Sequence, residues 1–353
     1  MIPQREYFDK DIANSDNTSG YYIVEKNDFV YNPRKSTDAP YGPISSYKYS
    51  EAGIVSPLYL CFRAKKAINP AFFEWYFRSS VWHRYVYMSG DSGARHDRVN
   101  IKDDTFFAMP INIPSTHEQA HITSFFERID QRIEMQRALV ENLKKYKRGV
   151  VRTLLTPDSC CIANATWTTA KIGDLGSFTK GAPLSKADIT PDGTPFILYG
   201  ELYTTYHEVI NTVIRRTQAQ PEKQHYSRVG DVIIPTSGET PEEISTAACV
   251  MLPDIILAGD LNIFRSSKID GRIMSYILNH IVNGQIARIA QGKSVVHVQA
   301  SELSKIEISY PDFNTQRKMI LVFETIATRI KSVENELMYL RSMQKALLQR
   351  LFI

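Results

Sequence analysis

The sequence contains little cysteine and no long apolar run. Its 4 cysteines, Cys61, Cys160, Cys161 and Cys249, form no CxxC pair and have no histidine at zinc-site spacing. This pattern favours reduced thiols without a structural role over a disulfide framework or a zinc site. Residues 1–20 lack the apolar stretch of a signal peptide, and no segment approaches the roughly 18 apolar residues of a membrane span. We therefore expect a cytoplasmic protein.

The usual catalytic motifs are also missing. There is no GxGxxG, no GxxxxGK[ST] phosphate loop and no GxSxG nucleophile elbow. An adenine methyltransferase would carry an Asn/Asp-Pro-Pro-aromatic motif, whereas the Asn-Pro pairs at 32–33 and 69–70 continue with arginine and alanine. None of the 38 acidic residues is followed by lysine two positions on, the pair that metal-dependent nucleases commonly use. These absences predict a binding protein with no catalytic residue, cofactor or metal on this chain.

The overall composition is that of an ordinary globular protein. Hydrophobic residues make up 43% and charged residues 23% of the chain, and 353 residues suggest two or three domains. The net charge of +4 and the sequence pI near 8.7 permit nucleic-acid binding without demonstrating it.

The chain repeats itself. Residues 117–155 align with 314–352, and pairs such as Gln119/Gln316 and Phe126/Phe323 share helical spacing. The β-rich runs 27–33 and 56–63 have partners at 230–236 and 261–268, with an offset of about 203 that falls to 201 at Trp75/Tyr276 and 199 at Gly93/Gly292. A repeat this long indicates two duplicated modules.

Each module combines short strands with helices. One shorter helix is expected at 70–87 and at 271–290, and a glycine turn with a strand follows at 92–101 and 291–300. Strand-rich units with one or two helices belong to the α+β class.

A long helix with a heptad pattern closes each module. Polar residues interrupt the pattern only at Gln136, Lys147 and Gln344. The apolar positions are Ile122, Phe126, Ile129, Ile133, Val140, Leu143, Val150 and Leu154 in the first helix, and Met319, Phe323, Ile326, Ile330, Val333, Leu337, Leu340, Leu347 and Leu351 in the second. Such a run predicts an antiparallel two-helix coiled coil roughly 50 Å long, with pseudo-twofold symmetry. The alternative is two amphipathic helices packed on their own domains.

These patterns predict five segments. A first target-binding domain occupies 1–115 and a first spacer helix 116–156; a linker at 157–166 leads to a second domain at 167–312 and a second spacer helix at 313–353.

Several loops carry side chains suited to DNA. Arginine, lysine, asparagine and small hydroxyl residues grip phosphates and read base edges. The candidates are Arg34, Lys35, Ser36, Tyr41, Arg95, His96 and Arg98 in the first half, and Lys180, Lys186, Thr236, Ser237, Lys293, Ser294 and His297 in the second. The basic run 143–152 is a further candidate, although a helix dipole would favour cations there anyway. The alternative for each residue is a solvated surface loop.

The chain resembles the specificity subunit of type I restriction-modification systems. The resemblance is carried by WTTAKIGDLGSFTKGAPLSKADITPDGTPFI (167–197), GDVIIPTSG (230–238), the QGKS turn (291–294), and above all PSTHEQAHI (114–122) with the helix that follows it. It implies two target-recognition domains that each read one half of a split double-stranded DNA sequence. It also implies two methyltransferase subunits that bind S-adenosylmethionine, and a restriction subunit that uses ATP and Mg²⁺, so that catalysis lies on other chains.

The first module departs from this pattern. The repeat offset places Met1 opposite Thr204, so the first domain has no counterpart to the 37 residues 167–203. We expect an amino-terminally incomplete first domain, and an impaired specificity subunit is one alternative function. A purely structural assembly protein and an enzyme with an unrecognised site are the others.

Overall fold

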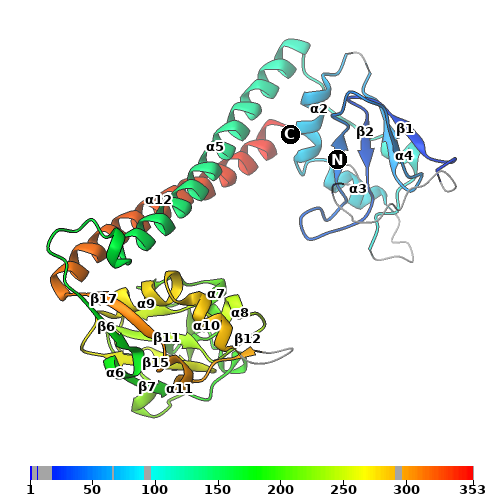
Figure 1. Ribbon diagram of the computed structural model, residues 1–353. Helices are drawn as coiled ribbons and strands as arrows, with labels where there is room; N and C mark the ends of the chain where they lie inside the picture. Colours follow the sequence, from blue (N-terminus) through cyan, green and yellow to red (C-terminus); the bar gives the residue numbers. More distant parts are fainter. Residues whose placement is uncertain (2–5, 7–17, 66, 91–96, 291–295, 353) are drawn as a thin grey trace. The chain divides into compact units, whose positions relative to one another are not determined.

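The computed structural model describes residues 1, 6, 18–65, 67–90, 97–290 and 296–352. The described chain divides into two compact units, which we call unit 1 (residues 1–139 and 333–353) and unit 2 (residues 140–332). Each unit consists of a mixed strand and helix body and a part of both long helices (Figure 1).

The body of unit 2 is built on a five-stranded sheet with the strand order β7-β15-β11-β13-β9. Its central strand β11 is buried at every position, as its continuous apolar run requires of a strand covered on both faces. The strands of unit 2 are β6 (Trp167–Lys171), β7 (Gly176–Lys180), β8 (Thr194–Leu198), β9 (Val209–Ile210), β10 (Arg215–Thr217), β11 (Asp231–Pro235), β12 (Ser237–Gly238), β13 (Ala248–Val250), β14 (Ile256–Ala258), β15 (Leu261–Ser266), β16 (Val296–His297) and β17 (Glu307–Pro311).

Smaller sheets and short helices complete this body. The sheets are β10-β8-β14, β12-β16 and β17-β6. The helices are α6 (Ile172–Leu175), α7 (Glu201–Thr204), α8 (Pro241–Ile244), α9 (Gly271–His280), α10 (Asn283–Ile289) and α11 (Ala300–Leu303), with 3-10 turns η1 (Pro157–Ser159), η2 (Lys186–Asp188) and η3 (Lys223–His225). Helix α9 packs on β13 and β11, and the residue before it, Asp270, caps its start by accepting a hydrogen bond from the Arg272 backbone amide.

Unit 1 has a smaller body with an aromatic core. Its strands are β1 (Tyr22–Val24), β2 (Phe29–Tyr31), β3 (Ile44–Ser46), β4 (Gly53–Val55) and β5 (Leu60–Phe62), and its helices are α2 (Pro70–Arg78), α3 (His83–Ser89) and α4 (Asp103–Phe107). Strands β3-β2-β5 form one sheet and β1-β4 another. Phe29 packs edge-on against Phe73 of α2 with ring centroids 5.4 Å apart, which joins sheet and helix.

The two long helices are α5 (Thr116–Leu154) and α12 (Phe313–Leu351). In unit 1 they run antiparallel: Arg132 pairs with Glu336 at 2.9 Å, while Asp130, two residues earlier, accepts from Gln344 at 2.7 Å. In unit 2 the end of α5 and the start of α12 share one apolar cluster that contains Val151 and Met319. The predicted α+β class with paired long helices is confirmed.

Most predicted heptad positions are buried or half-buried, and one is wrong. Leu351 is 45% exposed, whereas Leu348 and Phe352 are buried instead. The reason is the aromatic core of unit 1, against which Phe352 packs with its ring 5.4 Å from that of Phe72. The last turn of α12 therefore follows this core rather than the heptad.

The single helices predicted at 70–87 and 271–290 are each broken in two. The first break falls at Ser79, which is extended and whose hydroxyl donates to the Tyr76 carbonyl at 2.6 Å. The second separates α9 from α10 at Ile281 and Val282, whose amides both bond to the Ile277 carbonyl. Backbone groups at a helix end need such partners, and here the chain supplies them locally.

The structure repeats the internal symmetry in ion pairs. Arg63, directly after β5, binds Asp28 before β2, and Arg265 on β15 binds Asp231 at the start of β11. The Asp28 and Asp231 positions keep the predicted offset of 203, but the arginines are 202 apart rather than 203. The Arg63 guanidinium holds the pKa of Asp28 below its ordinary value, against the opposing effect of burial.

Equivalent glutamines, Gln119 in unit 1 and Gln316 in unit 2, make matching hydrogen bonds to the backbone. Gln119 Oε1 accepts from the backbone amide of Asn69, the residue before α2, at 2.7 Å, and its amide nitrogen donates to Pro114 O at 2.9 Å. Gln316 accepts from Asp270 N at 2.9 Å and donates to Pro311 O at 2.7 Å. Both side chains are 1% exposed. The repeated glutamine thus ties the start of each long helix to the shorter helix of its own unit.

Candidate nucleic-acid interface

In unit 2, four predicted residues surround one cavity. It has a volume of about 600 Å³ and lies beside the β12-β16 ladder, in which Ser237 pairs with His297. The lining residues are Lys180, Gly181, Pro183, Leu184, Ser185, Thr236, Ser237, Gly259, Asp260, Leu261 and His297. Strands β7, β12 and β16 and the residue before β12 therefore bring together Lys180, Thr236, Ser237 and His297, which lie as far as 117 residues apart in the sequence.

Hydrogen bonds fix the polar groups of this cavity. The Ser237 hydroxyl donates to Asp260 Oδ2 at 2.7 Å and lies 3.3 Å from His297 Nδ1. Lys180 Nζ donates to Asn262 Oδ1 at 2.9 Å. Partial burial lowers the pKa of Lys180, and the nearby charge of Asp260 opposes that shift. The carboxylate bonds to the serine and not to the histidine, so the arrangement is not that of a catalytic triad, in which the acid orients the histidine.

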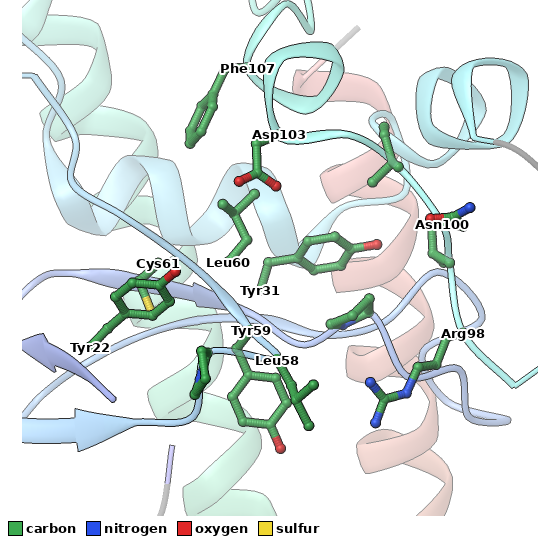
Figure 2. Close-up of a pocket in the computed structure, with 14 residues that line it drawn as sticks. Tyr22, Tyr31, Leu58, Tyr59, Leu60, Cys61, Arg98, Asn100, Asp103 and Phe107 are labelled. Carbon is green, nitrogen blue, oxygen red and sulfur yellow. The ribbon is translucent and has the colours of Figure 1, made fainter. Parts of the chain in front are cut away.

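In unit 1, the corresponding place is occupied by arginines. Arg34 and Arg98 form an isolated antiparallel bridge, flanked by hydrogen bonds from Val99 N to Pro33 O and from Lys35 N to Asp97 O, both 2.8 Å. Arg34, Lys35 and Ser36 are exposed. Arg98 is half-buried and lies at one side of a cavity of about 650 Å³, with Tyr22 and Cys61 on the other side (Figure 2).

The two places are equivalent in the repeat. The offset of 203 in the first strand relates Arg34 to Ser237, and the offset of 199 near the second strand relates Arg98 to His297. The flanking bonds are equivalent too, since Val298 N donates to Thr236 O at 3.0 Å as Val99 does to Pro33. Each unit therefore presents one cross-strand pair of polar side chains at the same point of its fold: Arg34 and Arg98 in unit 1, Ser237 and His297 in unit 2.

The other predicted residues lie apart from these pairs. The Tyr41 ring is half-buried and packs 4.8 Å from that of His83, whose pKa burial lowers. Lys186 is exposed on η2, next to Ser185 of the unit 2 cavity. The candidates Arg95, His96, Lys293 and Ser294 lie outside the described residues.

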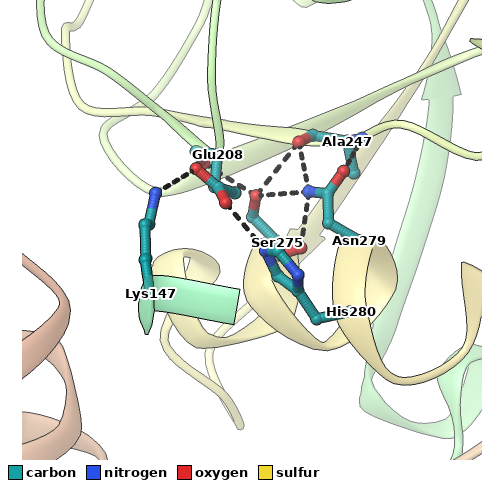
Figure 3. Close-up of polar contacts among 6 residues, drawn as sticks. All are labelled: Lys147, Glu208, Ala247, Ser275, Asn279 and His280. Carbon is teal, nitrogen blue, oxygen red and sulfur yellow. Dashed lines mark hydrogen bonds and ion pairs between the residues drawn. The ribbon is translucent and has the colours of Figure 1, made fainter. Parts of the chain in front are cut away.

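Lys147, one of the cations in the basic run, is not available for DNA. Its Nζ lies 2.7 Å from Glu208 Oε2 within unit 2, and only 13% of its side chain is exposed. His280 Nε2 lies 2.7 Å from the other Glu208 oxygen, while the Ser275 hydroxyl donates to the Glu208 carbonyl at 2.7 Å (Figure 3). Burial alone would raise the pKa of Glu208, but His280 and Lys147 hold it well below its ordinary value.

The network around Glu208 fixes α5 to the body of unit 2. The sequence contained one signal for it, the polar Lys147 at a heptad position, but nothing that identified Glu208 as its partner. Asn279 extends the network by donating to Ala247 O at 2.7 Å.

Neither a metal cluster nor a membrane-spanning helix occurs in the part of the chain that the structure describes. Its described residues contain no group of three or more histidine, cysteine, aspartate or glutamate side chains that could hold a metal ion. None of the helices in the described ranges is both long and apolar enough to cross a membrane.

These features define a duplicated α+β protein with two matching polar pairs and paired long helices. The chain belongs to the family of the type I restriction modification DNA specificity domain, whose sequence model matches residues 164–347, more than half of its length. The predicted resemblance is thereby confirmed. Specificity subunits of these systems recognise DNA and are non-catalytic, which also confirms the prediction that this chain is not itself an enzyme.

Solved structures show the same fold at low sequence identity. A chain from a structure of a type I R-M system, described as the basis of its complex assembly and conformational transition, aligns with a TM-score of 0.64 at 15% identity, over 92% of this chain and 81% of that one. The S subunit from M. genitalium aligns with a TM-score of 0.53 at 15% identity, over 97% and 87%. The HsdS subunit from Thermoanaerobacter tengcongensis gives 0.50 at 15% identity, over 94% and 81%. No curated protein matches the chain.

Proposed function

We propose that this chain recognises a bipartite double-stranded DNA target, with one half-site read by each unit. The observation that supports this most directly is the equivalence of the polar pairs Arg34/Arg98 and Ser237/His297. Two polar pairs at equivalent places in the fold, with different side chains, are suited to two half-sites of different sequence. Arginine favours guanine, whose O6 and N7 it can engage together, while serine and histidine offer other donors and acceptors.

The domain assignment follows from this proposal. Residues 1–115 and 167–312 are the two target-recognition domains, residues 116–156 and 313–353 are the spacer helices, and residues 157–166 are the linker. In this function the chain also docks two methyltransferase subunits and, where present, a restriction subunit. S-adenosylmethionine, ATP and Mg²⁺ then belong to those partners.

Selection from a random duplex library tests the proposal directly. The chain, assembled with its methyltransferase partner, should enrich two short sequence blocks separated by an unspecified gap of fixed length. Recovery of bound duplexes without any sequence preference would favour the alternative of a structural assembly protein and would refute sequence recognition by this chain.

Removing the cations of one pair should weaken DNA binding and its salt dependence. We expect the double variant Arg34→Ala/Arg98→Ala to lose at least about tenfold in affinity, because one arginine that engages a base well contributes about 1–3 kcal/mol. The slope of log affinity against log salt should fall by about 1 for each phosphate that the variant no longer neutralises. Fluorescence anisotropy at several salt concentrations measures both quantities.

A matched control lies at the other end of the same strand. Lys26 is exposed in the turn before β2, whereas Arg34 follows β2. The variant Lys26→Ala therefore removes a cation that lies away from the Arg34/Arg98 pair. Its affinity should stay at the wild-type value. If the control variant and the double variant lose affinity equally, DNA binding depends only on net charge, and the Arg34/Arg98 pair does not recognise the DNA sequence.

A further inference from the structure

The two members of the polar pair in unit 2 differ in their access to a ligand. Ser237 is only 7% exposed, whereas His297 on β16 is exposed. The imidazole is therefore the group that can make the contact, and the hydroxyl lies behind it. A neutral imidazole has one nitrogen that donates and one that accepts. What His297 can recognise thus depends on which of its ring nitrogens carries the proton.

A tight turn holds Asp260 beside this pair. The turn joins β14 to β15 through Gly259, whose φ of 76° favours glycine. The Asp260 carbonyl accepts from Thr236 N at 2.7 Å, and Thr236 O in turn accepts from Val298 N at 3.0 Å. Backbone hydrogen bonds to the neighbours of both members of the pair therefore fix the carboxylate, the hydroxyl and the imidazole relative to one another.

The position of the imidazole proton follows from these contacts. An ionised carboxylate can only accept, so the Ser237 hydroxyl is the donor in its 2.7 Å hydrogen bond to Asp260 Oδ2. With its hydrogen used there, the serine oxygen can only accept in its 3.3 Å contact with His297 Nδ1. Nδ1 must then carry the proton, which leaves Nε2 of the neutral ring as an acceptor.

The equivalent residue of unit 1 has the opposite hydrogen-bonding character. His297 corresponds to Arg98 at the repeat offset of 199, and a guanidinium only donates. Arg98 is therefore suited to base acceptors such as guanine O6 and N7, whereas an acceptor at Nε2 is suited to base donors. The donors that base edges present in the grooves are exocyclic amino groups, on adenine and cytosine in the major groove and on guanine in the minor groove.

We propose that Asp260 and Ser237 are positioning residues that hold the proton of His297 on Nδ1, and that His297 Nε2 accepts a hydrogen bond from the exocyclic amino group of one base. This assignment rests on the proposed DNA recognition and adds the chemical group that unit 2 recognises. It also accounts for a carboxylate at a DNA-binding place, where a negative charge repels phosphate.

The proton position can be tested in the full chain without DNA. In a nitrogen NMR spectrum of the histidine side chains at about pH 8, where an ordinary histidine is neutral, His297 should show a protonated Nδ1 and an unprotonated Nε2. The loss of these signals in His297→Ala assigns them. Ser237→Ala removes the acceptor of the Nδ1 proton, so part of the proton should then move to Nε2. A proton on Nε2 in the wild-type chain would overturn the proposal.

The recognised group can be tested with base analogues in the selected duplex. Purine for adenine, pyrimidinone for cytosine and hypoxanthine for guanine each remove the exocyclic amino group, and the effective analogue identifies the base. With the chain assembled with its methyltransferase partner, one such replacement should lower affinity at least about fivefold, as expected for one lost hydrogen bond. In His297→Ala the same replacement should change affinity by less than about twofold, because the acceptor is already absent.

Two further variants separate the histidine from its surroundings. His207→Ala removes an exposed histidine of unit 2 that does not line the cavity, and should keep the full effect of the analogue. Asp260→Asn should weaken that effect, because an amide can donate as well as accept and no longer dictates the direction of the serine hydroxyl.

The outcomes distinguish this proposal from the proposed function. A selection without sequence preference would refute DNA recognition as a whole. A selected target in which no analogue effect depends on His297 would overturn only the assignment of the amino group. An effect that disappears in Asp260→Asn but persists in His297→Ala would overturn it too, since the carboxylate would then contact the base itself.

Discussion

Replacing Gln316 by methionine should lower the free energy of unfolding of unit 2 by about 3 kcal/mol. Methionine keeps the length and volume of the side chain but can neither accept from Asp270 N nor donate to Pro311 O as Gln316 does. Both backbone groups then lose this hydrogen bond, in a place where the replaced side chain is 1% exposed. A buried polar group without a partner costs about 1–3 kcal/mol. Amide exchange resolved by residue measures the loss in unit 2 separately from unit 1.

The repeat supplies a second variant and a control. Gln119→Met should destabilise unit 1 by a similar amount, because its hydrogen bonds to Asn69 N and Pro114 O are equivalent. Gln131→Met changes an exposed glutamine on the same helix and should have an effect within about 0.5 kcal/mol. Should either buried variant be as stable as the Gln131 control, the glutamine does not hold the start of its long helix.

These glutamines show which features of the fold can be predicted from the sequence and which cannot. The alignment of Gln119 with Gln316 marked the position as shared, but their partners are backbone amides of Asn69 and Asp270, two different residue types. A hydrogen bond to a backbone group places no requirement on the residue type of the partner, so the sequence does not reveal it. The sequence therefore predicted the fold class, the repeat and the long helices, but not what joins them.

The same limit applies to the candidate interface. Loop composition selected both members of each polar pair, yet the pairing of Ser237 with His297 depends on a ladder that closes across 60 residues. The heptad prediction was wrong at Leu351 because the core of unit 1, built from residues distant in sequence, determines which side chains of the last turn of α12 are buried. Periodicity reports the surroundings of a helix only where these are regular along its length.

The ion pair of Lys147 and Glu208 carries the second large prediction. Lys147→Met should lower the free energy of unfolding of unit 2 by roughly 3–5 kcal/mol, because it leaves a buried carboxylate with His280 as its remaining close partner. Lys145→Met, at an exposed position of the same helix, is the matched control and should be close to neutral. The double variant Lys147→Met/Glu208→Gln removes the buried charge and should recover part of the loss, which a double-mutant cycle measures.

The pH dependence of this loss follows from the lowered pKa of Glu208. In the unfolded chain a glutamate titrates near pH 4.3, whereas in unit 2 burial is outweighed by His280 and Lys147 and the pKa lies well below that. The stabilisation is therefore fully present above about pH 4.3 and is lost as the pH falls through the folded pKa. In Lys147→Met the pKa of Glu208 should rise, since burial remains while a cation is removed. The gap in stability between wild type and variant should then be largest near neutral pH and narrow below about pH 4. A gap of constant size would mean that the lysine acts through its ammonium group over the Tyr276 ring and not through Glu208.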